Sequence, residues 1–321
     1  MTYYLGIDIG GTKCAVIRGN REGRVLDKVR FPTTTPAKTL EQIYAAADRL
    51  ISEGHACGEV PVAIGISCGS PLDAKRGIIQ EPPNLPGWVN VPIVAEMTRR
   101  TGLPAFLCND ANACALAEWY FGAGRGTRNM IFLTFGTGMG AGLILDGRLY
   151  AGTTGDAGEI GHVRLADTGP LGYFKHGSVE GFCSGGGLAQ LGKSFAADAL
   201  AAGRAPAYCP TAAGMEAVTA QTIADAAHAG DETALAVYRT CGTRLGQALS
   251  ILVDLFNPER MVIGSIFARS GDLLVDAMRE VMERECLPTA LAACEIVPAA
   301  LTESVGDLAA LTIAIHGGAG L

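Results

Sequence analysis

The chain has 321 residues, 49% of them hydrophobic and 18% charged, so it can bury substantial cores and is expected to form two domains. Its net charge of −7 argues against a broad nucleic-acid or membrane-surface footprint, although a local phosphate pocket is compatible with it. The first residues lack the basic segment of a secretion signal, and the ten cysteines are scattered without metal-binding spacing. We therefore expect a cytoplasmic protein with reduced cysteines that binds neither nucleic acid nor membrane.

The first predicted element, residues 3–17 (YYLGIDIGGTKCAVI), is a pair of strands joined by a glycine turn. The glycine turn of a P-loop or a dinucleotide site opens a helix, so the strand that follows here argues against both. Glycine N–H groups can face an anion, and a carboxylate beside them can organise a cation with its water shell. The sequence therefore predicts a phosphate-binding turn, and the alternative is an ordinary hairpin turn. The candidate binding residues are Asp8, Gly10, Gly11, Thr12 and Lys13.

Helices and strands then alternate as far as residue 121. The patterns predict helices at residues 39–53, 93–101 and 111–121, and strands at 60–68 and 104–108. Residues 69–92 are too rich in proline and glycine for regular structure and too long for a connector, as is common in binding loops. Residues 122–129 (GAGRGTRN) are expected to form the hinge between the domains.

Asn109 and Asp110 lie where a predicted strand ends and a helix begins, the place at which α/β folds position active residues. An aspartate there can take the proton from a hydroxyl that attacks phosphorus. The alternative is a helix N-cap, which aspartate also performs well, and one residue could do both.

A second strand–glycine–strand element follows at residues 130–145 (MIFLTFGTGMGAGLIL). Its turn contains Gly136, Thr137, Gly138 and Gly140. Two such turns, about one domain's length apart, indicate a duplicated architecture that grips one polyphosphate from opposite sides.

Carboxylates and an imidazole follow among glycines, at Glu159 and His162 (AGEIGH) and at Glu180. Such acceptors suit hydrogen bonding to sugar hydroxyls, although a structural role for the histidine remains open. Further helices are predicted at residues 188–204, 218–229, 231–256 and 307–316, with a strand at 260–263. The alternation indicates α/β layers.

Five motifs in order, DIGGTK, PNLPGW, NDANA, GTGMGAG and AGEIGH, resemble the ROK family of sugar kinases and sugar-responsive repressors. The resemblance implies an α/β, two-lobed actin/hexokinase-like (ribonuclease H-like) fold with duplicated hairpin-containing mixed sheets. The lobes would be residues 1–121 and 122–304, with 305–321 as a closing helix that returns to the first lobe. It also implies a cytoplasmic kinase that transfers the terminal phosphoryl group of MgATP to a hexose hydroxyl, possible as a homodimer.

The resemblance carries roles onto matching positions. It implies that Asp110 is the catalytic base. The implied sugar contacts are Asn84, Asn109, Glu159, His162 and Glu180. The implied nucleotide contacts are the residues of both glycine turns, with Mg²⁺ near Asp8, and Gly264 near the adenosine part.

The chain departs from the family pattern in the loop from Gly172 to Ser178. Family members place there a closely spaced set of cysteines that bind a structural zinc together with the histidine matching His162. This chain has Gly172, Phe174 and Ser178 instead, none of which is a thiolate ligand. The alternative is a different zinc site that uses His176 and Cys183. We predict that the protein has no structural zinc. Gly264 is followed by Ser265 where the family has a glycine run, so polyphosphate as donor stays open beside ATP.

The motifs do not choose the sugar. Glucose is the default of the family, with fructose, mannose, allose and N-acetylhexosamines open. The family's repressors carry a DNA-binding domain before the first glycine turn, which this sequence has no room for, so DNA binding is not expected. A sugar-binding regulator without catalysis is the remaining alternative from another class.

Overall fold

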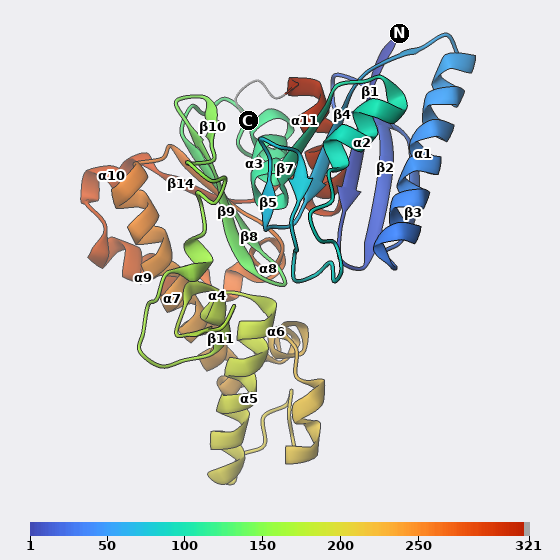
Figure 1. Cartoon of the computed structure of the whole chain (residues 1–321). Coiled ribbons are helices and arrows are strands. Elements are labelled where there is room, and N and C mark those ends of the chain that lie inside the picture. Colours follow the sequence, from blue (N-terminus) through green and yellow to red (C-terminus); the bar gives the residue numbers. More distant parts are fainter. Residues whose placement is uncertain (318–321) are drawn as a thin grey trace. The chain divides into compact units, whose positions relative to one another are not determined.

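The computed structural model describes residues 1–317 and resolves two compact units, whose elements are labelled in Figure 1. Unit 1 contains Met1–Arg128, Gly142–Ala157 and Ala300–Leu321, and unit 2 contains Asn129–Ala141 and Gly158–Ala299. Residues 318–321, the end of the expected closing element, lie outside the described residues. These units group residues by packing, and the functional lobes 1–121, 122–304 and 305–321 stay a prediction.

The first sheet has the strand order β3-β2-β1-β4-β7. The first three strands form an antiparallel meander, and β4 and β7 add in parallel. The expected glycine turn joins β1 to β2. The bounds are β1 (Thr2–Ile9), β2 (Lys13–Gly19), β3 (Val25–Pro32), β4 (Val60–Cys68) and β7 (Ala105–Asn109).

Helices cover both faces of this sheet (Figure 1). Because side chains alternate along a strand, Leu5 and Ile7 pack against α1 (Pro36–Ala56) and α2 (Ile93–Thr101). The opposite face packs against α11 (Val305–His316), which also contacts α3 (Asp110–Phe121).

Two glycines let α11 lie directly on the sheet. Gly6 and Gly65 are paired across β1 and β4. A β-carbon at Gly6 would lie 2.9 Å from the Leu311 nitrogen, and one at Gly65 would lie 2.2 Å from the Ala310 oxygen. Since no side chain fits there, both positions require glycine. The same close approach places Gly306, at the start of α11, beside Asp8, whose Oδ2 would be 3.1 Å from a β-carbon at Gly306.

The second sheet repeats the first, with the order β10-β9-β8-β13-β14. Here β10 pairs antiparallel with β9, and β13 pairs parallel with both β8 and β14. The second glycine turn joins β8 to β9. The bounds are β8 (Met130–Phe135), β9 (Met139–Leu145), β10 (Arg148–Tyr150), β13 (Arg260–Ile263) and β14 (Glu295–Pro298).

The helices of unit 2 pack around α7 (Glu232–Phe256). Asp231 caps its start by accepting the Ala234 N–H, and Asn257 ends it in the left-handed conformation. β-Carbons at Gly242 and Gly246 would lie 2.7 Å and 2.5 Å from carbonyl oxygens of Leu274 and Met278, so α7 and α9 approach closely. The other helices are α4 (Val179–Phe182), α5 (Gly185–Ala201), α6 (Ala220–His228), α8 (Ile266–Ser270), α9 (Val275–Glu285) and α10 (Pro288–Ala293).

Two short hairpins lie outside these sheets. The pair β5 (Leu72–Asp73) and β6 (Ile78–Ile79) lies in the 69–92 stretch, so the prediction that this stretch has no regular structure is wrong. The pair β11 (Leu171–Gly172) and β12 (Lys175–His176) lies where the family resemblance implies zinc ligands.

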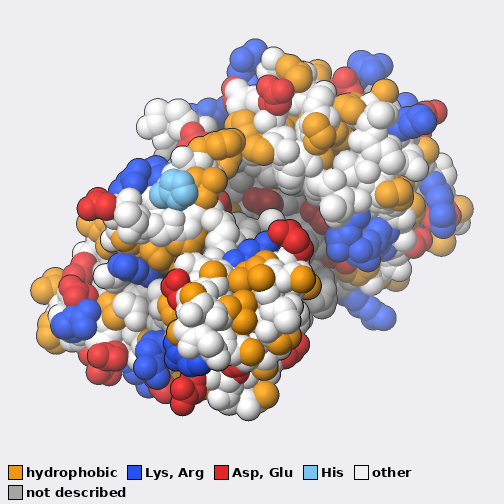
Figure 2. Space-filling view, turned by 90° about the horizontal axis from the view of Figure 1, so that it is seen from below, with side chains coloured by type: hydrophobic (Ala, Val, Ile, Leu, Met, Phe, Trp, Pro, Cys, Tyr) orange, Lys and Arg blue, Asp and Glu red, His pale blue; other side chains and the backbone are white. Residues whose placement is uncertain are grey.

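Surface composition agrees with the charge balance. On the face in Figure 2, acidic and basic side chains are interspersed among hydrophobic and uncharged ones. Over residues 1–317, none of the helices combines the length and the apolar character needed to cross a bilayer.

Candidate functional site

The first glycine turn is held against the 69–92 loop. The Gly10 N–H donates to the Lys13 carbonyl at 3.1 Å and closes the turn. A β-carbon at Gly11 would lie 2.5 Å from the Asn84 carbonyl oxygen, so glycine is required where the turn meets the loop. The turn residue and the predicted sugar residue Asn84 are therefore neighbours in unit 1.

Asp8 is partly buried at the end of β1 and lies in an acidic environment. Burial, followed by the charges of Asp307 and Asp110, raises the pKa of its carboxyl to about 6, against the lowering effect of Lys28 and Lys13. Lys28 is itself engaged by Asp307, with 2.6 Å between Nζ and Oδ2. Excess negative charge of this kind favours a cation.

Asp8 can supply one carboxylate ligand to a Mg²⁺ ion whose other ligands are water and phosphate oxygens. Within residues 1–317, no three His, Cys, Asp or Glu side chains form a group that could hold a metal ion by themselves. Mg²⁺ is usually bound by one or two carboxylates together with water and substrate phosphates. The single, partly buried Asp8 carboxylate beside the first glycine turn is compatible with that mode of binding.

Asn109, rather than Asp110, is the N-cap of α3. Its Oδ1 accepts the N–H groups of Ala111 and Asn112, and its Nδ2 donates to Ser70 Oγ at 2.7 Å. A β-carbon at Gly69, the residue before Ser70, would lie 3.4 Å from Asn84 Oδ1. The bend at residues 69–70 thus brings both predicted sugar-binding asparagines of unit 1 together.

Asp110 follows the cap residue and has an exposed residue surface. The Asp110 Oδ1 accepts the Ala111 N–H at 2.8 Å, and Asn109 Oδ1 accepts the same N–H. Desolvation by the surrounding protein raises the pKa of the Asp110 carboxyl, and the backbone hydrogen bond from Ala111 opposes this effect. A carboxylate with a raised pKa that reaches solvent has the properties of a general base.

The second glycine turn is fixed by hydrogen bonds within unit 2. The Gly136 N–H donates to the Gly138 carbonyl at 3.1 Å, and the Gly136 carbonyl accepts the N–H of Gly185 at 2.8 Å. Glu180 Oε2 accepts the Met139 N–H at 3.1 Å. The turn is thereby tied to the start of α5 and to a predicted sugar residue.

The remaining predicted sugar residues also lie in unit 2. His162 ends a short 3₁₀ turn (Ile160–His162), and Glu159 is exposed directly before it. A β-carbon at Gly161 would lie 2.1 Å from the Met139 carbonyl and 3.4 Å from the Glu180 Cβ. Since Gly161 packs so closely, this turn and Glu180 lie together beside the second glycine turn.

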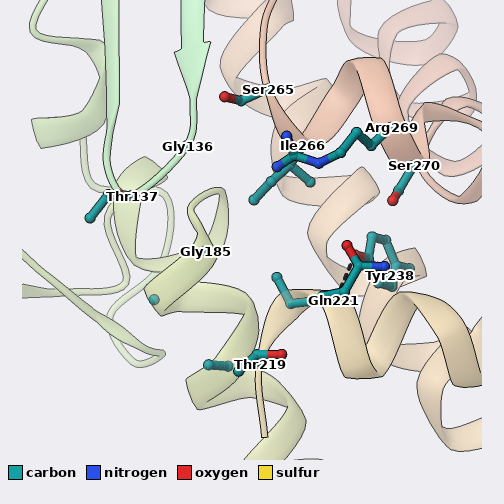
Figure 3. A pocket seen from close by; sticks show the side chains of 13 residues that line it. Gly136, Thr137, Gly185, Thr219, Gln221, Tyr238, Ser265, Ile266, Arg269 and Ser270 are labelled. Carbon is teal, nitrogen blue, oxygen red and sulfur yellow. Dashed lines mark hydrogen bonds between the residues drawn. The ribbon is translucent and has the colours of Figure 1, made fainter. Parts of the chain in front are cut away.

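A cavity of about 500 Å³ in unit 2 adjoins that turn, and Figure 3 shows the side chains around it. Gly136 and Thr137 line it from the turn, and Gly185 from the start of α5. Its volume lies within the usual range for small-molecule sites. The other lining residues come from α5, from the start of α6, from α7 and from the region of α8: Gly186, Ala189, Thr219, Ala220, Gln221, Tyr238, Ser265, Ile266, Arg269 and Ser270.

Gly264 does not line this cavity. Its N–H donates to the Leu133 carbonyl at 2.9 Å, and a β-carbon at this position would lie 3.4 Å from the Phe132 ring. The next residue, Ser265, lines the cavity with φ 49°, a backbone conformation typical of glycine. Sequence reasoning did not find Thr219, Gln221 or Arg269, because they lie at helix ends that meet only in the folded unit.

Comparison with known proteins decides the family: the model of the ROK family matches residues 4–316. The chain belongs to the ROK family. It is 32% identical over 310 residues to the glucokinase of Thermotoga maritima, covering 96% of each chain.

Solved structures agree with the repeated sheets. The ROK hexokinase of Thermus thermophilus matches with a TM-score of 0.79 and 31% identity over 97% of each chain. A ROK glucokinase of Streptomyces griseus, in complex with glucose and AMPPNP, gives a TM-score of 0.74 and 31% identity over 97% of this chain and 99% of that one. The predicted actin/hexokinase-like α/β fold with duplicated mixed sheets is confirmed.

The zinc that the family resemblance implies does not fit the residues present. His176 Nδ1 forms a hydrogen bond with the Gly169 carbonyl at 2.9 Å. The Cys183 thiol donates to the Cys241 carbonyl, and burial raises the pKa of that thiol well above its usual value, which disfavours the thiolate. The two side chains of the alternative zinc site are thus engaged elsewhere, and the absence of zinc stays a prediction.

Proposed function

We propose that this protein is an ATP-dependent sugar kinase of the glucokinase type, which transfers the terminal phosphoryl group of ATP to a hexose hydroxyl. The observation on which the proposal rests is that Asn109 and Asp110 have different roles at the start of α3. Asn109 caps the helix, and the neighbouring Asp110 keeps a solvent-reaching carboxylate. The glucokinases among the relatives support the choice of reaction.

Asp110 is the proposed base. Its carboxylate accepts the proton of the sugar hydroxyl as that oxygen attacks the terminal phosphorus of the donor. Desolvation raises the pKa of the Asp110 carboxyl, which makes it a better proton acceptor than an ordinary surface aspartate. The rate is therefore expected to fall as the pH drops into the range in which this carboxyl becomes protonated.

The two glycine turns are the proposed phosphate holders. Their backbone N–H groups offer donors to the phosphate oxygens, and the cavity bounded by Gly136 and Thr137 accommodates the nucleoside. Mg²⁺ bound with the donor supplies neutralisation of phosphate charge. Asp8 is the residue proposed to hold it, which is consistent with the acidic environment of that carboxyl.

The residues proposed to contact the sugar are Asn84, Asn109, Glu159, His162 and Glu180. Glu180 has one carboxylate oxygen left to accept a sugar hydroxyl beside its bond to the Met139 N–H. Glucose is the first expectation because the relatives named above include glucokinases. Fructose, mannose, allose and N-acetylhexosamines are the alternatives, with polyphosphate as the alternative donor.

The test is an ADP-release assay over these sugars, followed by Asp110→Asn with the best one. The variant is expected to lose most of kcat, by about 10²-fold or more, and to bind the sugar with nearly unchanged affinity. Asp48→Asn is the matched control, because Asp48 lies on the surface in an ion pair with Arg100. Turnover of Asp110→Asn at the wild-type rate would remove this assignment, and sugar binding without ADP release in the wild type would favour a silent regulator.

We also propose a cytoplasmic location and a small-molecule role without nucleic-acid or membrane partners, with a homodimer as the expected assembly. All ten cysteines are free, which suits a reducing compartment. Fractionation of cells and sedimentation of the purified protein test these two points.

A further inference from the structure

The loop that departs from the family pattern forms a tight β-hairpin. Strands β11 and β12 pair through Leu171 with His176 and Gly172 with Lys175, which leaves Tyr173 and Phe174 as a two-residue turn. Both turn residues have positive φ, 38° and 63°. Asparagine and glycine are the usual residues of such a turn, and bulky side chains adopt this conformation at a cost. Two aromatic residues here need a reason other than turn preference.

Hydrogen bonds fix the hairpin from both sides. Gln190, on α5, accepts the Leu171 N–H and donates to the Leu171 carbonyl, both at 2.9 Å. Arg164 donates to the His176 carbonyl at 3.1 Å. A β-carbon at Gly172 would lie 2.4 Å from the Gly181 nitrogen, so the hairpin also packs tightly on α4. These protein contacts hold the segment in a defined position.

The hairpin contacts His162 at its ring and at its backbone. The ring of Tyr173 meets the imidazole edge-on, with 4.9 Å between centroids and 73° between planes. Lys175 Nζ, on the other side of the turn, donates to the His162 carbonyl at 2.7 Å. Edge-to-face packing of this geometry restricts the orientation of a ring, and the second contact restricts the backbone that carries it.

Tyr173 and Phe174 have different surroundings. Phe174 is 89% exposed and Tyr173 is 51% exposed, so Tyr173 is the more covered of the two; the Phe174 ring lies tilted against the Tyr173 ring, with 5.2 Å between centroids. The tyrosine is the one of the two in ring contact with His162. The strained turn thus presents one aromatic ring to a predicted sugar ligand and leaves the other in solvent, which provides a matched pair for mutation.

We propose that Tyr173 is a positioning residue that orients His162 toward the sugar, so that an aromatic contact takes the place of the family's zinc. The inference rests on the proposed function, in which His162 binds the sugar. In this arrangement the hairpin makes the sugar site independent of a structural metal. The contact acts on sugar binding and leaves the donor site, which is built from other residues, unaffected.

The test compares Tyr173→Ala, Tyr173→Phe and Phe174→Ala by their KM for the sugar and for ATP. Tyr173→Ala is expected to raise the KM for the sugar by about three- to tenfold with the KM for ATP unchanged, from the usual strength of an aromatic pair. Tyr173→Phe keeps the ring and should restore the wild-type value, and Phe174→Ala should remain within about twofold of it. An unchanged sugar KM in Tyr173→Ala, or an equal rise in both KM values, overturns the proposal.

A double-mutant cycle with His162→Ala separates positioning from general support of the fold. If Tyr173 acts through His162, adding Tyr173→Ala to His162→Ala leaves the sugar KM of the single His162 variant unchanged. Additive effects would overturn the proposal. Should Tyr173→Ala fold poorly, the same cycle with Tyr173→Leu decides.

The cycle also distinguishes this inference from the function it rests on. A wild-type enzyme that phosphorylates no sugar refutes the proposed function, and a normal sugar KM in His162→Ala refutes the sugar role of the histidine. An effect of His162→Ala without one of Tyr173→Ala refutes the inference alone.

Discussion

Replacing Asp8 by asparagine is expected to stabilise the free protein while it abolishes activity. In the folded state the Asp8 carboxyl has a pKa of about 6, and the ordinary value is 3.8. The folded protein therefore binds more protons at this site than the unfolded chain between these pH values. Its contribution is fully favourable below pH 3.8 and is lost as the pH rises through 6. Asparagine has nearly the same shape and never carries the charge.

The difference between the two pKa values corresponds to about 3 kcal/mol once both states are ionised. This is an upper bound, because Asp8 is only partly buried. We expect Asp8→Asn to raise the free energy of unfolding by up to about 3 kcal/mol at pH 8 and by about half as much at pH 5. Urea denaturation at the two pH values measures it, with Asp48→Asn as the surface control. A neutral or destabilising effect at pH 8, or one that does not change with pH, would refute the reasoning.

Ser265→Gly is expected to stabilise the protein by about 1–2 kcal/mol, because glycine adopts φ 49° without side-chain strain, and to alter only the KM for the donor. Donor titrations and urea denaturation check it, and unchanged stability would contradict it. Glu118→Gln is expected to destabilise by about 2–4 kcal/mol, since this fully buried carboxylate accepts the N–H groups of Ala123, Ala300 and Leu301 and an amide has one acceptor oxygen. A denaturation midpoint equal to wild type would count against that role. Metal analysis of protein purified without added metal should find no stoichiometric zinc, and one zinc per chain would show that the loop binds it after all.

The strongest local signals led to correct structure. The DIGGTK turn and the helix that Asp231 caps could be predicted because turn chemistry, caps and hydrophobic period agree there. Strand β3 was missed because its pattern is dominated by exposed and half-buried residues of an edge strand. Helix α9 was missed as well: only one stripe of its charged sequence is buried, against α7.

The candidate site was only partly readable in advance. Adjacent Asn109 and Asp110 are both good caps, so only the fold could show that the asparagine caps the helix. The cavity residues Thr219 and Arg269 lie at helix ends far apart in sequence, and no local pattern connects them. The hairpin at Tyr173 has no asparagine–glycine signal, so its turn could not be predicted from residue type.

The seat of α11 on Gly6 and Gly65 has a consequence for biosynthesis. The strands that carry these glycines are translated well before the helix that covers them, because β1 and β4 precede α11 in the chain. One apolar side of the nascent first sheet thus stays uncovered until α11 has been translated, a state that favours aggregation. A chain truncated before residue 305 would lack α11 and could not complete the packing of the first sheet.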